Sequence, residues 1–104
     1  MSDEATRLRK VVVERVLHGA GTTTGDERRA AFENRDVQPA ASALIDKVTK
    51  HAWKVTDEDV EAARRAGLSD DQVFELSVAA ALGQSTRQLE VALAALDAAT
   101  EPAK

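Results

Sequence analysis

Adjacent carboxylates are the first feature of this sequence with a possible chemical role. Asp70 and Asp71 stand together in the stretch AGLSDDQVFEL, and a carboxylate pair of this kind can hold a cation or transfer protons. The earlier stretch KVTDEDV has the same order of residue types, with Thr56 in the place of Ser69. Ser and Thr are preferred helix N-caps, and acidic residues in the first turn are stabilised by the helix dipole. We therefore predict that both aspartates begin a helix rather than form a site.

Glu75 is the carboxylate with the stronger claim to chemistry. It stands between Phe74 and Leu76 in the apolar run VFELSVAAAL, on a helix that we expect to be mostly buried. A buried carboxylate must find a partner or take up a proton. Two interpretations are therefore open, a proton-transfer group or a structural salt bridge. The candidate partners for a salt bridge are Arg64, Arg65 and Arg87.

The two histidines are the remaining candidates for acid–base chemistry. Neither belongs to an HxxxH or HExxH pair, so we predict no local metal site and no cofactor. His18 follows Glu14 by four residues near a helix end, where a cation is stabilised, and we expect a capping or surface role. His51 borders the apolar stripe of a predicted helix, where either a structural role or a general acid–base role is open. In an enzyme, the catalytic candidates would be His51 and Glu75.

Composition narrows the classes of function. The 104 residues suit one domain, residues 1–104, and a hydrophobic fraction of 43% can supply a core. The absence of cysteine excludes disulfides, thiolate nucleophiles and Cys-ligated metal sites. A net charge of −4 argues against a nucleic-acid partner. The charged start MSDEATRLRK has no apolar signal region and no apolar run approaches the roughly 20 residues of a membrane span, so we expect a cytoplasmic protein without membrane contact.

Helical patterns account for nearly the whole chain. Apolar residues recur at helical spacing, alanine is abundant, and no segment alternates as a strand does. We therefore predict an all-α domain of about five or six helices, with residues 100–104 as a frayed tail. The predicted starts are Ser2, the Thr24–Glu27 capping box, Pro39, Thr56 and Ser69, and the predicted stops include Gly19 and Gly67. The last apolar run is either interrupted at Gly83 or continues through it.

The run VTDEDVEAARRAGLSDDQVFEL, followed by SVAAALG, resembles the AhpD-like, or carboxymuconolactone decarboxylase-like, superfamily of small all-α proteins. There, a helix followed by Gly-[LF]-S-[DE]-[DE]-x-[IV] leads into an alanine-rich core helix, and the likeness covers about residues 43–96. The redox branch uses a C-x-x-C pair, which this chain lacks, so the resemblance implies no peroxidase activity. The decarboxylase branch uses acid–base chemistry on a lactone acid. The superfamily commonly forms dimers, trimers or hexamers.

Leucines in the last predicted helix point independently to self-association. Leu82, Leu89 and Leu96 recur every seven residues with Leu93 beside them, although an intramolecular core would also use such a line. We therefore expect a cysteine-less AhpD-like homo-oligomer that acts as a scaffold or small-ligand-binding protein. Two alternatives are a cofactor-free acid–base enzyme of the decarboxylase or lactonase type, and an accessory subunit that binds another protein through its terminal helix.

Overall fold

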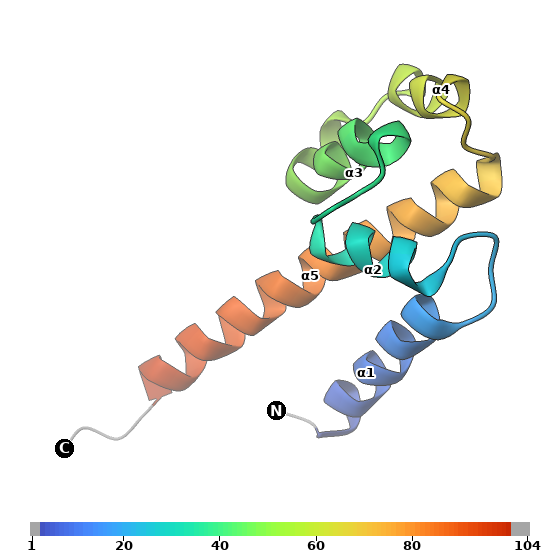
Figure 1. Ribbon diagram of the computed structural model, residues 1–104. Coiled ribbons are helices and arrows are strands. Elements are labelled where there is room, and N and C mark those ends of the chain that lie inside the picture. The colour runs from blue at the N-terminus through green and yellow to red at the C-terminus, as the bar shows by residue number, and fades with distance from the viewer. Residues whose placement is uncertain (1–2, 101–104) are drawn as a thin grey trace.

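The computed structural model describes residues 3–100, which form five α-helices, one 3-10 turn and no strand (Figure 1). The elements are α1 (Asp3–His18), α2 (Gly25–Glu33), α3 (Pro39–His51), η1 (Ala52–Lys54), α4 (Asp57–Arg65) and α5 (Asp70–Thr100). The predicted all-α fold is confirmed. Thr100 is still helical, whereas the rest of the predicted tail and the predicted cap Ser2 lie outside the described residues.

The predicted capping signals start three of the helices. In each, the N-cap side chain accepts a hydrogen bond from the third helical backbone N–H, and the side chain of that third residue accepts one from the cap N–H. The pairs are Thr24 with Glu27, Thr56 with Asp59 and Ser69 with Gln72. Asp70 and Asp71 accordingly occupy the first turn of α5, as predicted. Within residues 3–100 no group of three or more His, Asp or Glu side chains is arranged to hold a metal ion.

The junction between α4 and α5 is a Schellman motif. Gly67 has a φ of 112°, and its N–H donates to the carbonyl of Arg64 at 2.9 Å. The N–H of Leu68 donates to the carbonyl of Ala63 at 3.2 Å, and both of these residues are buried. The predicted role of Gly67 as the residue after the helix end is confirmed, and this turn sets the direction in which α5 leaves α4.

The core lies between the first half of α5 and helices α2, α3 and α4. It is built mainly from small and aliphatic side chains, which allow the helices to approach closely. Its buried residues are Ala31, Ala41, Leu44, Ile45, Ala63, Leu68, Val73, Leu76, Ala79 and Ala80. Sequence patterning predicted that α5 would be covered on several sides, but Phe74 is 69% exposed and only one side of this half is buried.

Helix α5 continues through Gly83, and α2 packs directly against it at this residue. A Cβ atom at this position would lie 1.9 Å from the carbonyl oxygen of Phe32, so only glycine fits. One turn further along α5, the Nη1 atom of Arg87 donates to the same oxygen at 2.6 Å. Arg87 thus satisfies a carbonyl at the C-terminal end of α2 that the helix itself leaves unpaired.

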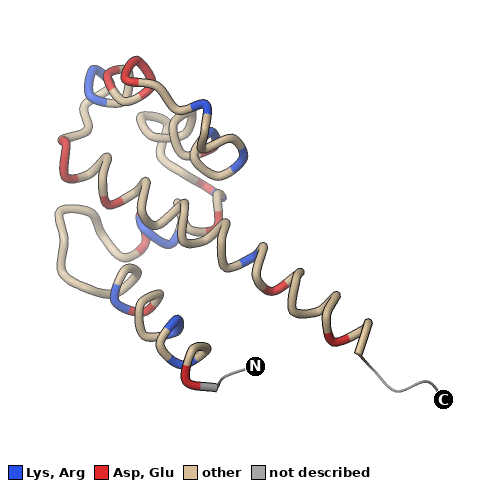
Figure 2. Tube along the Cα trace, turned by 180° about the vertical axis from the view of Figure 1, so that it is seen from behind, with Lys and Arg blue, Asp and Glu red and all other residues tan. Residues whose placement is uncertain are grey.

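Helix α5 extends well beyond this core. The chain measures 58 × 28 × 21 Å, and its radius of gyration is 16.0 Å, against about 13 Å for a compact domain of this size. Helix α1 runs in the opposite direction to α5 and diverges from it, as Figures 1 and 2 show from opposite sides. Despite the length of α5, no helix within residues 3–100 combines the length and apolarity that crossing a membrane requires.

Candidate functional site

A groove of about 680 Å³ lies between α1 and the second half of α5. It is mostly apolar, with charged side chains from both helices along it. Helix α1 contributes Ala5, Thr6, Arg9, Lys10, Val13 and Glu14, and α5 contributes Thr86, Leu89, Glu90 and Leu93. This volume lies in the range of ligand-binding and docking sites in proteins. The groove exists because α1 and α5 touch near one end and separate toward the other.

Arg9 joins the two walls of this groove. Its Nη2 atom donates to the hydroxyls of Ser85 at 3.1 Å and Thr86 at 3.0 Å. Its Nε atom is buried and has no hydrogen-bond partner among the described residues. No described carboxylate forms an ion pair with Arg9. This side chain therefore fixes how closely α1 approaches α5, while part of its hydrogen-bonding capacity is unused.

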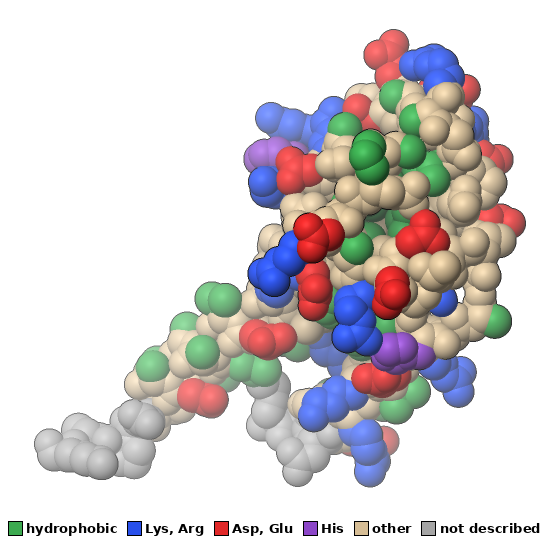
Figure 3. Space-filling view, in the orientation of Figure 1, with side chains coloured by type: hydrophobic (Ala, Val, Ile, Leu, Met, Phe, Trp, Pro, Cys, Tyr) green, Lys and Arg blue, Asp and Glu red, His purple; other side chains and the backbone are tan. Residues whose placement is uncertain are grey.

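The last part of α5, which we call the distal segment (residues 89–100), is unusually apolar for an exposed helix. Every residue in it except Leu93 is exposed, and Glu90 and Asp97 are its only charged residues. Leu89 is 38% exposed and Leu96 is 53% exposed. Figure 3 shows hydrophobic side chains along this protruding segment. The leucine line that predicted self-association therefore includes exposed surface, together with the half-buried Leu82 and Leu93.

Helix α1 adds apolar surface of its own. Leu8, Val11 and Val12 are 59%, 45% and 50% exposed, and none of the three lines the groove. Only the C-terminal end of this helix is well covered, where Leu17 is buried and Val16 packs against the core. The two helices that form the groove are thus also the helices that leave most apolar surface uncovered.

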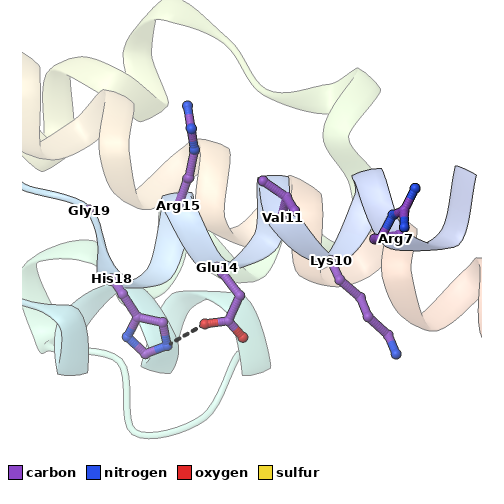
Figure 4. A pocket seen from close by; sticks show the side chains of 7 residues that line it. All are labelled: Arg7, Lys10, Val11, Glu14, Arg15, His18 and Gly19. Carbon is purple, nitrogen blue, oxygen red and sulfur yellow. Dashed lines mark ion pairs between the residues drawn. The ribbon is translucent and has the colours of Figure 1, made fainter. Parts of the chain in front are cut away.

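A second, shallower hollow of about 460 Å³ runs along the outer side of α1 (Figure 4). It is lined by Arg7, Lys10, Val11, Glu14, Arg15, His18 and Gly19. The Nε2 atom of His18 lies 3.3 Å from the carboxylate of Glu14, and both side chains are more than half exposed. The exposure of His18 confirms its predicted surface position. Figure 4 shows Arg15 pointing away from that pair, so the cations of this hollow do not converge on one point.

Glu75 fastens the α1–α2 loop to α5. Its Oε1 accepts from the N–H of Thr23 at 2.9 Å and its hydroxyl at 2.6 Å, and its Oε2 accepts from the N–H of Thr22 at 2.9 Å and its hydroxyl at 2.7 Å. Partial burial alone would raise the pKa of the Glu75 carboxyl, but these four bonds lower it to about 2. A Cβ atom at Gly21 would lie 2.6 Å from Oε1, so the glycine permits this close approach.

The environment of Glu75 was only partly predictable. A partner for this half-buried carboxylate was expected, but the partners are threonine amides and hydroxyls rather than an arginine. Of the predicted arginines, Arg64 instead pairs with Asp70 and Glu61, and Arg87 binds the carbonyl of Phe32. The sequence GTTTG has hydroxyls beside flexible glycines, which is a weak signal for carboxylate binding. Nothing local connects that loop to a residue more than fifty positions away.

The structure does not bring His51 and Glu75 together in a described cavity. His51 is exposed at the end of α3, where its ring makes an edge-to-face contact with Trp53 at 5.3 Å between centroids. No described hydrogen bond or ion pair joins it to Glu75, and neither residue lines the groove or the hollow on α1. Glu75 is ionised at neutral pH and both of its oxygens are occupied, which suits a structural carboxylate better than a proton donor.

Comparisons with protein-family models, with curated proteins and with solved structures find no match for this chain. The groove and its two helices therefore carry the functional interpretation on their own chemistry.

Proposed function

We propose that this protein is a homo-oligomeric helical scaffold that self-associates through α5 and the neighbouring face of α1. The observation that carries the proposal is the distal segment, which exposes Leu89 and Leu96 directly beside an apolar groove. The leucine line of the sequence, Leu82, Leu89, Leu93 and Leu96, supplies the contact surface. The mass in solution distinguishes a dimer from a trimer or a hexamer.

Energetics support a partner for this surface. Most helical stability in proteins comes from the packing of an apolar face rather than from helix propensity. The distal segment continues a packed helix and needs no separate nucleation, but almost all of it is exposed in the single chain. Monomeric soluble proteins rarely leave contiguous apolar patches larger than a few hundred Å² uncovered. A second copy would stabilise the helical state of this segment and cover the leucines at the same time.

Membership of the AhpD-like superfamily is part of the proposal. Its support is the junction at Gly67, where a helix ends, the Ser69 capping box follows, and an alanine-rich helix packs in the core. In that setting the chain would be a member without peroxidase activity, because it has no cysteine. No contact of His51 or Glu75 favours the acid–base enzyme over the scaffold.

The mass of the protein in solution tests self-association. We expect light scattering to give a multiple of the 11.1 kDa chain mass, and Leu93→Glu to reduce it to a single chain. The helical circular dichroism of this variant should fall by no more than the contribution of the distal segment, because the rest of the fold does not depend on the second copy. The matched control is Trp53→Glu, which places the same charge on an exposed apolar side chain of η1, outside the groove. A wild-type chain that remains monomeric at every concentration contradicts the proposal and leaves this surface to a different protein.

A further inference from the structure

The groove-side residues of α5 follow the spacing of a coiled-coil seam. Steps of four and three residues alternate along this line, as they do for the core positions of paired helices. The positions are Leu82, Thr86, Leu89, Leu93, Leu96 and Thr100. Three of them, Thr86, Leu89 and Leu93, line the groove directly. A second helix that packs along this seam would therefore lie in the groove.

Helix α1 decides the direction of that second helix. It is held against α5 at Ser85 and Thr86 by Arg9, so this part of the seam is already partly covered. In a parallel pair, the parts of α5 that α1 already covers would face each other. The distal segments would then pair only with each other, and both grooves would stay empty. An antiparallel pair instead places each distal segment beside the groove of the other copy.

We propose that two copies form an antiparallel four-helix bundle, in which the distal segment of each α5 occupies the α1–α5 groove of the other. This inference rests on the proposed self-association and adds its partner segment and register. In an antiparallel pair of helices, an a position of one heptad faces a d position of the other. This sets Leu89 against Leu93 of the second copy and Leu96 against its Thr86. The two-fold axis then crosses between the two helices at the level of residue 91, and both copies use the same surface.

The size of this contact suits a small, reversible dimer. The ten groove residues and the twelve residues of the distal segment overlap in part. Val91 and the other residues on the outer side of the segment do not take part, so about fifteen residues from each copy can contribute, fewer than the 20–30 typical of a stable specific interface. The distal segment is about 18 Å long at 1.5 Å per residue, so it can lie along most of the groove.

The same register makes an electrostatic prediction. Glu90 lies one residue from the two-fold axis, so the two Glu90 carboxylates approach each other, and Lys10 in the same groove offsets only part of their repulsion. Glu90→Gln is therefore expected to tighten the dimer about two- to fivefold. Asp97→Asn removes the same charge further from the axis and is expected to change the dissociation constant by less than about twofold.

Disulfide trapping tests the arrangement directly, because the natural chain has no cysteine. We expect mild oxidation of a mixture of Thr86→Cys and Leu96→Cys chains to link the two variants, and neither variant to link to itself. In the proposed register, each of these two residues lies about ten residues, or 15 Å along the helix, from the same residue of the second copy. This distance is too great for a disulfide. Val91→Cys is the matched control, since it lies at the level of the axis along the helix but is 70% exposed on a face outside the groove.

The outcomes separate this arrangement from self-association itself. A cross-link between the two variants, absent with Val91→Cys, supports the antiparallel bundle. Self-linking of Leu96→Cys would show parallel helices and overturn it. A dimer by light scattering without the mixed cross-link would also overturn it while leaving the proposed scaffold in place. A monomeric chain would overturn both.

Discussion

Thr23 and Glu75 are joined by two hydrogen bonds to one oxygen atom. The N–H and the hydroxyl of Thr23 both donate to Oε1 of Glu75, at 2.9 and 2.6 Å. Thr22 repeats the pattern on Oε2, so the loop of residues 19–24 is tied to α5 by a single carboxylate. Because this loop carries α1, Glu75 acts together with Arg9 to hold α1 at the angle that opens the groove.

Replacement of Glu75 tests this clamp. Glu75→Gln keeps the size of the side chain but leaves one acceptor oxygen in place of two. The new NH2 group is a donor, and it would face the N–H and hydroxyl donors of Thr22 or Thr23. We expect the free energy of unfolding in urea to fall by roughly 2 kcal/mol, as for lost hydrogen bonds to a charged group. The control is Glu61→Gln, at an exposed carboxylate paired with Arg64, for which a change within about 0.5 kcal/mol is expected. Equal effects of the two substitutions would contradict the clamp.

The clamp also predicts a pH dependence. The pKa of the Glu75 carboxyl falls from 4.5 to about 2 in the folded protein. A carboxyl whose pKa is lowered by folding stabilises the fold fully above its unfolded pKa, and this contribution disappears as pH falls through the folded pKa. The difference in unfolding free energy between the natural chain and Glu75→Gln should therefore be constant near neutral pH and shrink between about pH 4.5 and 2. A pH-independent difference would show that the carboxylate charge is not what matters.

Gly83 provides a prediction with an unusual sign. Glycine to alanine inside a helix normally stabilises it by about 1 kcal/mol. At Gly83 the added methyl group would collide with the carbonyl oxygen of Phe32, so we expect destabilisation of roughly 1–3 kcal/mol in thermal or urea unfolding. Gln88→Ala, at an exposed position of the same helix, is the control and should be neutral or slightly stabilising. A stabilised Gly83→Ala protein would show that α2 does not pass this close to α5.

Gly67 tests the backbone alone. No atom lies within 4 Å of a Cβ built at this residue, so an alanine there meets no steric obstacle. Its φ of 112° nevertheless disfavours any L side chain, and Gly67→Ala should cost roughly 1–2 kcal/mol of unfolding free energy. Ala66→Ser, at the preceding exposed residue with ordinary helical φ, should change stability by less than about 0.5 kcal/mol. Comparable losses at the two positions would argue against the Schellman turn.

Local signals in the sequence predicted the beginnings and ends of the helices. The capping boxes at Thr24, Thr56 and Ser69 and the stop at Gly67 all lie where their residue types indicate. These features depend on hydrogen bonds and dihedral angles within a few residues, and such interactions are encoded in short stretches of sequence. The all-α fold follows from the same local preferences.

Long-range relationships needed the tertiary structure. The sequence allowed the helix either to stop at Gly83 or to continue through it. The structure shows that it continues, and contact with the carbonyl of Phe32 explains why a glycine stands at this point of the helix. The sequence also indicated that Glu75 needs a partner, but only the fold brings Thr22 and Thr23 to that carboxylate. The leucine line predicted apolar surface, whereas the groove beside it depends on the angle between α1 and α5. Helix formation is local and thus readable in the chain itself, but the positions of helices relative to one another arise from packing between residues far apart in sequence.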